Sequence, residues 1–292
     1  MATTKKSADV ETHQKSTELV IADETAALVA SEFDDLYAEA AGAGFENVTR
    51  DDIQLPRLVI LQPTSPEIQE DPDAYRAGDI IDNITKENFG SNFLYYPLFH
   101  FKNNTRWEAP EPGSAIDCRS MDAIQGDKKD AAHGGGNCLT CPFSKFIDNA
   151  DGTRTAPSCT QFNNMVMFAA SGEGGPIVYS AKRTALKGFK AMLNQAMNIR
   201  VKLLDGRSVP LALYFGLWRL TTVKNTANKQ TWYTPKFEFQ GKVEDVQLMH
   251  MLKDMHTDLK EKQSKFTIDQ SDVDVYADPP AEEVIAEDQI PY

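Results

Sequence analysis

The chain has 292 residues, of which 41% are hydrophobic and 25% charged, and its formal net charge is −13. This composition provides enough apolar surface for a core in one or two domains. No apolar run approaches the roughly 20 residues that span a membrane, and the polar start, residues 1–7, lacks the apolar core of a secretory signal. We therefore expect a cytoplasmic protein without membrane contact.

The acidic charge is concentrated at the two ends of the chain. Residues 1–54 hold twelve acidic and four basic side chains, and residues 269–292 hold eight acidic and no basic ones, so that the body between them, 55–268, carries +3. We predict an acidic N-terminal segment with one helix, a folded body with an inserted cysteine segment at 118–159, and a disordered acidic tail. Net charge alone argues against a nucleic-acid partner, but its distribution favours one for the body.

The first predicted elements are one helix and three strands. Apolar residues at helical spacing predict a helix over 24–41, which either packs on the body or binds a partner. Strands are expected over 55–62, 77–83 and 92–102, and the loop after the first is rich in proline and acidic residues. The third strand is aromatic and alternates between two faces, as a half-buried strand does.

All four cysteines fall between residues 118 and 159, at Cys118, Cys138, Cys141 and Cys159. The CxxC pair presents two thiolates to one tetrahedral ion, and loops of similar length bring the outer cysteines back to it. Because a cytoplasmic chain favours metal ligation over disulfides, we predict that these four residues bind a structural Zn²⁺. The alternatives are a redox CxxC, unlinked thiols, and replacement of one cysteine by His133.

The rest of the body alternates strands and helices. We expect strands over 164–170, 177–181, 210–224 and 231–242, and helices over 184–198 and 243–263. The last two strands form a hairpin whose turn is residues 225–230. In its second strand Tyr233 and Phe237 share one face, and Trp232 and Lys236 share the other.

The order of these elements predicts a fold. Counted from residue 92, with the cysteine segment as an insertion, the order is strand, strand, strand, helix, strand, strand. An OB-fold, a small five-stranded barrel that often binds oligonucleotides, has this order, and so do other β-barrels and α+β folds. We predict a β-rich α+β protein with an OB-fold-like five-stranded barrel, a zinc-stapled insertion and flanking helices.

The most basic part of the chain is residues 160–242, with twelve Lys and Arg against three acids and with aromatic residues interleaved. Cations neutralise phosphates and flat rings stack on unpaired bases, although a solvated charged face over an aromatic core has the same composition. For phosphate contacts we predict Arg183, Lys187, Lys190, Arg219, Lys224 and Lys236. For base stacking we predict Tyr214, Trp218, Trp232 and Tyr233.

Catalytic motifs are absent from the sequence. It contains no GxxxxGK[ST] phosphate loop, no HExxH and no GxSxG. The basic stretch also has too few acids to converge on a two-metal nuclease site. We therefore expect a protein that is not an enzyme.

The acidic tail ends on Glu287-Asp-Gln-Ile-Pro-Tyr292. This end resembles the C-terminal tip of bacterial single-stranded DNA-binding proteins, where acids are followed by Ile-Pro-Phe; here Tyr292 replaces the Phe and Gln289 replaces an acid. The resemblance implies that the tip recruits replication and recombination proteins through Glu287, Asp288, Ile290, Pro291 and Tyr292. The alternative is an appendage that only adds solubility.

The whole layout also resembles the replication-type single-stranded DNA-binding proteins of tailed bacteriophages, although residues 1–160 contain no recognisable bacterial core of that family. The resemblance implies sequence-tolerant, salt-sensitive binding of single-stranded DNA in the cytoplasm of a bacterial host. One alternative is a zinc-bearing structural or interaction scaffold without a nucleic-acid role, which burial of both Trp218 and Trp232 favours. Another is a transcription regulator that reads duplex DNA through the zinc module.

Overall fold

The computed structural model describes residues 40, 43–44, 56–109, 114–227 and 229–261. The chain divides into two units, Met1–Gln54 and Leu55–Tyr292, and the fold below is that of the second. The predicted helix at 24–41 and the acidic tail lie outside the described residues. Within the described part of the chain, no helix combines the length and the apolar character needed to cross a membrane.

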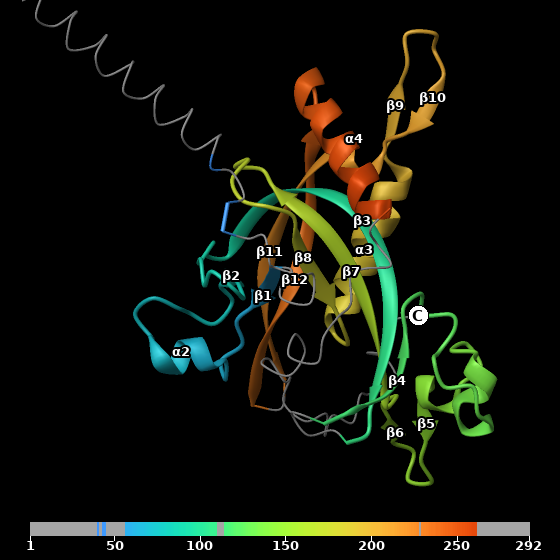
Figure 1. The fold of residues 1–292 in the computed structure, drawn as a ribbon. Coiled ribbons are helices and arrows are strands. Elements are labelled where there is room, and N and C mark those ends of the chain that lie inside the picture. Colours follow the sequence, from blue (N-terminus) through green and yellow to red (C-terminus); the bar gives the residue numbers. More distant parts are fainter. Residues whose placement is uncertain (1–39, 41–42, 45–55, 110–113, 228, 262–292) are drawn as a thin grey trace, which may run out of the picture. The chain divides into compact units, whose positions relative to one another are not determined.

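The second unit consists mainly of strands (Figure 1). The strands are β1 (Arg57–Ile60), β2 (Ile80–Asp82), β3 (Asn92–Trp107), β4 (Ile116–Ser120), β5 (Ile147–Asp148), β6 (Arg154–Thr155), β7 (Cys159–Ala169), β8 (Ile177–Ala181), β9 (Arg200–Lys202), β10 (Ser208–Pro210), β11 (Gly216–Ala227) and β12 (Gln230–Lys242). The helices are α2 (Pro66–Glu70), α3 (Ala185–Asn198) and α4 (Val246–Glu261), with 3-10 turns η2 (Ala131–Gly136), η3 (Pro142–Ser144) and η4 (Leu213–Phe215). The β-rich α+β class predicted from the sequence is confirmed.

Eight strands form one sheet in the order β12-β11-β3-β7-β8-β1-β2, with β4 also paired to β3. Among the strands of the described residues, only β1 and β8 pair in parallel. The sheet curls into a half-barrel around the long strand β3 (Figure 1). The five strands predicted for a barrel correspond to β3, β7, β8, β11 and β12, and these are neighbours in the sheet. The predicted number of strands was wrong, because β1, β2 and β4 join the same sheet.

One face of the sheet packs under α3. Tyr95 of β3 and Trp218 of β11 belong to the buried cluster on this face, together with Phe189 of α3. A Cβ at Gly188 would lie only 2.7 Å from the carbonyl oxygen of Pro235. The absence of a side chain at residue 188 therefore lets α3 lie directly against β12.

The other face packs under α4. Leu252 of this helix is fully buried and clusters with Phe99 of β3, so the helix predicted over 243–263 is confirmed as a helix that packs on the body. A β-bulge in β3 interrupts the pairing with β7 between Pro97 and Phe99. Because a bulge shifts the alternation by one residue, Tyr95 and Phe99 face opposite sides although they are four residues apart.

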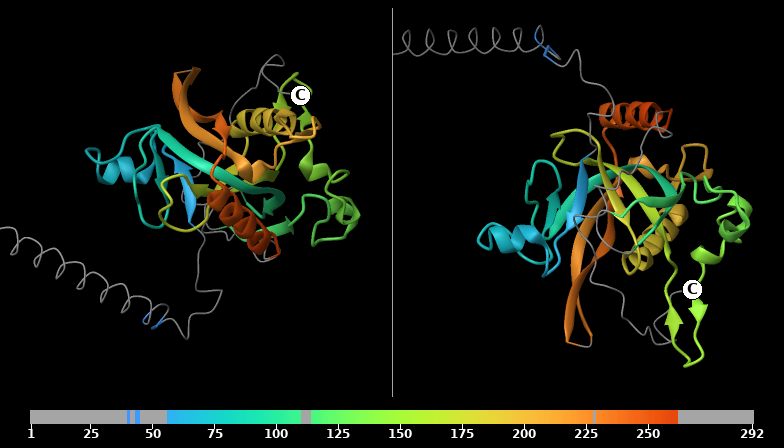
Figure 2. Two further views of the ribbon diagram at one scale, coloured as in Figure 1. Left: turned by 90° about the horizontal axis from the view of Figure 1, so that it is seen from above. Right: turned by 60° about the horizontal axis from the view of Figure 1, so that its bottom comes forward.

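The long hairpin extends beyond the sheet (Figure 2). β11 and β12 pair as far as Ala227 and Gln230, whereas β11 pairs with β3 only over residues 218–221. The connection is thus shorter than the predicted turn at 225–230. The predicted strand over 210–224 was wrong at its start, since β11 begins at Gly216.

Candidate metal centre and nucleic-acid interface

The sheet places two of the four cysteines beside one arginine. Cys118 of β4 and Cys159 of β7 are both paired with Arg106 of β3, one on each side. Directly paired residues on neighbouring strands point to the same face. The outer cysteines of the sequence are therefore brought to one face of the sheet, although 40 residues separate them along the chain.

The CxxC pair lies in a tight turn above this face. The backbone nitrogen of Cys141 donates to the carbonyl oxygen of Asn137 at 3.0 Å. The hydroxyl of Ser144 lies 2.7 Å from the carbonyl oxygen of Cys138 and 2.8 Å from that of Cys141. These bonds hold the two cysteines of the pair on one side of the turn.

Glycines allow the loop to approach the cysteines closely. A Cβ at Gly134 would lie 2.9 Å from the Cα of Cys141, and one at Gly126 would lie 3.0 Å from the sulfur of Cys118. Gly134 also has a φ of +64°, in the left-handed region that glycine adopts without strain. Gly134 and Gly126 thus allow close packing around the cysteines.

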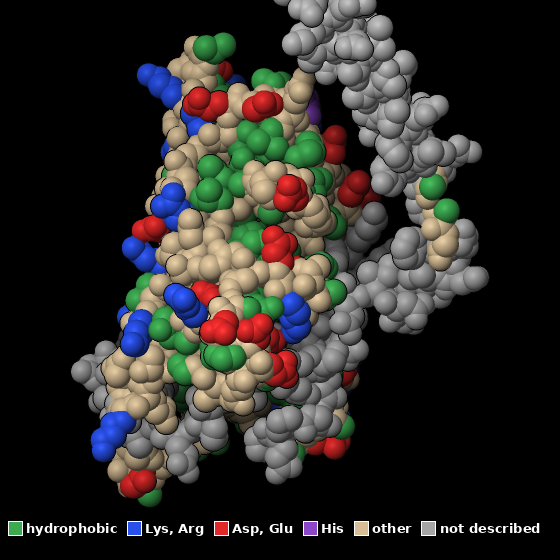
Figure 3. Space-filling view, turned by 90° about the vertical axis from the view of Figure 1, so that its left-hand side faces the viewer, with side chains coloured by type: hydrophobic (Ala, Val, Ile, Leu, Met, Phe, Trp, Pro, Cys, Tyr) green, Lys and Arg blue, Asp and Glu red, His purple; other side chains and the backbone are tan. Residues whose placement is uncertain are grey.

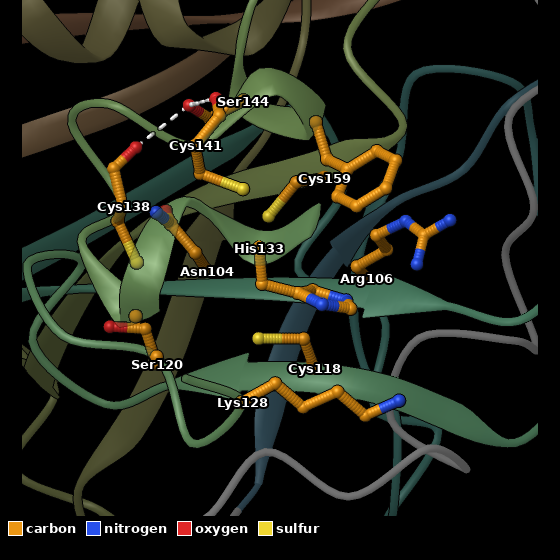
Figure 4. Close-up of a pocket in the computed structure, with 13 residues that line it drawn as sticks. Asn104, Arg106, Cys118, Ser120, Lys128, His133, Cys138, Cys141, Ser144 and Cys159 are labelled. Atoms are coloured by element: carbon orange, nitrogen blue, oxygen red, sulfur yellow. Dashed lines mark hydrogen bonds between the residues drawn. The ribbon is translucent and has the colours of Figure 1, made fainter. Parts of the chain in front are cut away.

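All four cysteines line one small pocket (Figure 4), which has about 20 Å³ of free space. In Figure 4 the side chains of Cys141 and Cys159 point toward one another. The four are free thiols, and the pocket has room for about one water-sized particle or ion. Among the described residues, no three Cys, His, Asp or Glu side chains are placed as a metal-ligating group, so the cysteines are gathered but not at coordination distances.

The electrostatics of the pocket follow from burial and from the close thiols. Burial, together with the charges of Cys138, Cys141 and Cys118, raises the pKa of Cys159 to about 12. In addition, the side-chain oxygen of Asn104, which also lines the pocket, is buried without a hydrogen-bond partner. Four sulfurs and an unsatisfied oxygen around so small a space fit a thiophilic cation such as Zn²⁺.

His133 is occupied by two carboxylates. Its Nδ1 lies 2.7 Å from Asp130, and its Nε2 lies 2.9 Å from Asp117. Both ring nitrogens are therefore used, which argues against His133 as a substitute metal ligand. Asp117 also contacts Arg106 and Lys128. The sequence analysis did not predict this ion network, and the only signal for it was the position of Asp117 next to Cys118.

The nucleic-acid candidates on the long hairpin divide between its two faces. The pairs Arg219–Glu238, Thr221–Lys236 and Asn225–Trp232 point away from the core cluster, whereas Trp218–Phe239 and Leu220–Phe237 point into it. The alternation predicted for the second strand is confirmed. We call the outward side chains of Arg219, Thr221, Val223, Trp232, Thr234 and Lys236 the hairpin strip. Of these, Val223 and Lys236 are exposed, and the other four are half-buried.

Three of the four predicted stacking residues lack a free ring. Trp218 is 1% exposed in the core, so the prediction that it stacks on a base was wrong. The ring of Tyr214 stacks on His256 with centroids 4.6 Å apart. The ring of Tyr233 lies against Gly78, where a Cβ would be 2.6 Å from it. Trp232 is half-buried on the outer face and is the remaining stacking candidate.

The predicted phosphate contacts are exposed or at the surface. Lys187 and Lys190 lie on the solvent face of α3, Arg183 precedes that helix, and Lys224 lies on the outer half of the hairpin. Lys236 pairs with Glu238 at 2.8 Å, and Arg219 also lowers the pKa of Glu238, after the hydrogen bond and charge of Lys236. On the face in Figure 3, Lys and Arg side chains gather along one edge.

The predicted partner-binding residues, Glu287, Asp288, Ile290, Pro291 and Tyr292, lie outside the described residues. The sequence analysis missed the second hairpin, β9 and β10, which carries Arg200 and Lys202. Its turn contains Asp205-Gly206, a dipeptide that is a strong hairpin signal and could have indicated it.

Comparison with known proteins gives one match. No curated protein and no solved structure matches the chain. The sequence model of the family described as "Pam3 phage gp34-like protein" matches residues 23–265, which is most of the chain and includes every described strand and helix. The chain therefore belongs to the Pam3 phage gp34-like protein family.

Proposed function

We propose that this phage-family protein binds single-stranded DNA along its long hairpin and is not an enzyme. The observation that carries the proposal is the neighbour order of the five predicted strands. β3 lies between β7 and β11, β8 lies next to β7, and β12 lies next to β11. An OB-fold has this arrangement, with a helix between its third and fourth strands, and α3 occupies that place in the chain.

The strand order indicates which two loops of this chain correspond to the oligonucleotide-binding loops of an OB-fold. In OB-folds, oligonucleotides bind on the face of the second and third strands and on two loops, one after the first strand and one between the fourth and fifth strands. In this chain the first of these loops contains the cysteine segment, and the second is the tip of the β11–β12 hairpin. Figure 1 and the right-hand view of Figure 2 show the cysteine segment and the tip of the β11–β12 hairpin at the same end of the sheet.

The side chains of the hairpin strip suit an unpaired strand. Arg219 and Lys236 supply positive charge for phosphates, and Trp232 supplies an indole that is not part of the core. A groove of cations and aromatic rings binds single strands with little sequence preference. Glu238 offsets part of this charge, so binding should depend on both cations and on Trp232 together.

The cysteine pocket has a structural role in this proposal. Cys118, Cys138, Cys141 and Cys159 would hold a Zn²⁺ ion, which supplies four metal–sulfur bonds that staple the loop to strands β4 and β7. The segment also carries exposed Lys129 and Lys145. A rigid loop places such cations beside a bound strand.

The acidic tip, Glu287–Tyr292, would recruit replication or recombination proteins in the host cytoplasm, as its likeness to bacterial single-stranded DNA-binding proteins implies. The competing proposal is a zinc-bearing scaffold without a nucleic-acid role. It expects both Trp218 and Trp232 to be buried. Trp218 is buried and Trp232 is not, so the first proposal keeps one stacking residue.

Tryptophan fluorescence tests the proposal. The full chain is titrated with an oligo-dT strand at low and high salt, because phosphate-driven binding weakens steeply with salt. Saturable quenching that disappears in Trp232→Phe and persists in Trp218→Phe supports the proposal, provided that circular dichroism shows both variants folded. If the wild-type chain shows neither quenching nor a mobility shift, the scaffold reading replaces it.

A further inference from the structure

Between α3 and β11 the chain forms a second, smaller hairpin, β9 and β10. Val201 pairs with Val209, and the backbone nitrogen of Leu203 donates to the carbonyl oxygen of Arg207 at 2.8 Å. Gly206, in the turn, has a φ of +86°, which the absence of a Cβ permits. The hairpin projects from the sheet near α4 (Figure 1). It is an ordered projection with a defined tip.

The tip presents leucines to solvent. Leu204 has a relative exposure of 110% and Leu203 one of 37%, and nearby Met197 is 74% exposed. Turns ordinarily hold polar residues or glycine, and an apolar side chain stabilises a fold only when it leaves water. Leu204 therefore gains no stability from burial, and Leu203 leaves part of its side chain in water. Single exposed apolar side chains are common on protein surfaces, so the charge beside these leucines is needed to indicate a partner.

The charge around the tip indicates the chemistry of that molecule. The chain that leads from α3 to the tip, residues 185–204, contains no acidic side chain. Arg200 and Lys202 lie on the strand that leads to the tip and are exposed. In the turn itself, the charge of Asp205 is paired with that of Arg207 at 2.6 Å. A partner with a polyanionic backbone and flat apolar faces, which is nucleic acid, complements this surface.

We propose that the β9–β10 hairpin inserts Leu203 and Leu204 at the end of a DNA duplex and separates the terminal base pairs. Apolar side chains, leucine among them, insert between base steps and unstack them. Arg200 and Lys202 would hold the phosphates beside the inserted leucines. The inference rests on the proposed function, because the separated strand would pass to the single-strand surface of the hairpin strip.

A forked DNA with 2-aminopurine at the last base pair of the duplex tests the proposal, since this base fluoresces more strongly when it is unstacked. The full-length chain is compared with the double variant Leu203→Ser/Leu204→Ser. The matched control is Ile84→Ser, which removes an exposed apolar side chain between β2 and β3. We expect wild type and control to raise the fluorescence, and the double variant to need about tenfold more protein for the same rise.

The outcomes separate this proposal from the proposed function. Binding of oligo-dT by the double variant should stay within about twofold of wild type, because the hairpin strip is intact. If the double variant and the wild type open the fork equally, the proposed strand separation by the β9–β10 hairpin is wrong. It is also wrong if the wild type binds oligo-dT but leaves the fork closed. A wild-type chain that does not bind oligo-dT would instead contradict the proposed function. If the double variant changes only the sedimentation mass, the tip is a protein contact and the proposed strand separation is rejected.

Discussion

The cysteine segment and the long hairpin are held in place by different forces. Within residues 118–159 the only buried hydrophobic residues are Ala123 and Cys141, and Leu139 is 72% exposed. The hairpin, in contrast, places Trp218 and Leu220 in the main core. Apolar burial is the dominant stabilising term in most folds. The hairpin is therefore stable through its own packing, whereas the segment needs another source of stability.

The structure offers two such sources for the segment. One is the ion network in which Asp117 contacts Arg106, Lys128 and His133. The other is the pocket lined by the four cysteines. Asp117 and His133 are largely buried, and in a buried ion pair the cost of desolvation offsets much of the attraction. We therefore expect a bound metal, if the pocket holds one, to supply most of the stability of the segment. The comparison predicts that the two regions fail under different treatments.

Removing the metal should have the largest effect, and only on the cysteine segment. Chelation, or Cys138→Ser, should release zinc and expose residues 118–159 to protease, because structural zinc binds with about 10–16 kcal/mol of apparent free energy in small zinc modules. Zinc content and the map of protease cuts measure this, with Leu139→Ser as the matched control inside the same turn. A purified chain without zinc, whose segment resists protease, would contradict the metal centre.

Removing an indole from the core should have the next largest effect, and only on the hairpin and sheet. Trp218→Ala should lower the free energy of unfolding by about 3–5 kcal/mol, as for other buried aromatic residues. Trp232→Ala should leave thermal stability nearly unchanged, since its side chain is half-buried outside the core cluster. Thermal unfolding compares the two variants. Similar losses would mean that Trp232 is structural, and the stacking role would be rejected.

The packing of α3 on β12 can be changed by a substitution that alters no polar side chain of the cysteine segment or of the long hairpin. Gly188→Ala places a Cβ 2.7 Å from the carbonyl oxygen of Pro235. We expect a loss of about 1–3 kcal/mol, the usual effect of overpacking, although alanine favours a helix interior. Gly175→Ala is the control, because a Cβ there meets nothing within 4 Å. A stabilised Gly188→Ala variant would show that α3 does not pack this closely on β12.

The smallest expected effects concern the charges of the hairpin strip. Lys236→Ala should weaken oligo-dT binding and reduce its salt dependence, whereas Glu238→Gln should strengthen binding, because it removes the acid that pairs with Lys236. Changes of roughly two- to fivefold are expected for exposed charges. Fluorescence anisotropy at several salt concentrations measures both. Lys253→Ala, which removes an exposed cation on α4, should change nothing; a loss of affinity as large as that of Lys236→Ala would indicate a general charge effect instead.

The sequence predicted the elements of the fold better than their limits. Helical and strand periodicity indicated α3, α4 and every strand of the main sheet except β4, because each of these buries one regular face. Periodicity did not predict three features that depend on the local turn residues. These are the turn of the long hairpin, the start of β11, and the β9–β10 hairpin around Gly206.

The candidate site was predicted unevenly for a physical reason. CxxC spacing indicated which cysteines meet, since metal ligation restricts the spacing of ligands. The spacing of aromatic residues in a basic stretch does not indicate which of them face solvent. Trp218 and Trp232 were therefore equal candidates for base stacking in the sequence, and only the register of β11 and β12 places them on opposite faces. The His133 network depends on contacts across strands and loops that no local pattern records.

Photo-crosslinking of the full-length chain to an oligo-dT that carries 4-thiothymine is the most direct test of where a single strand binds. Peptide mapping by mass spectrometry then identifies the linked residues. Our account predicts crosslinks in β11 and β12, with Trp232 among them, and in the cysteine segment 118–159. Crosslinks confined to α2 or α4, or none at a concentration that saturates binding, would contradict it.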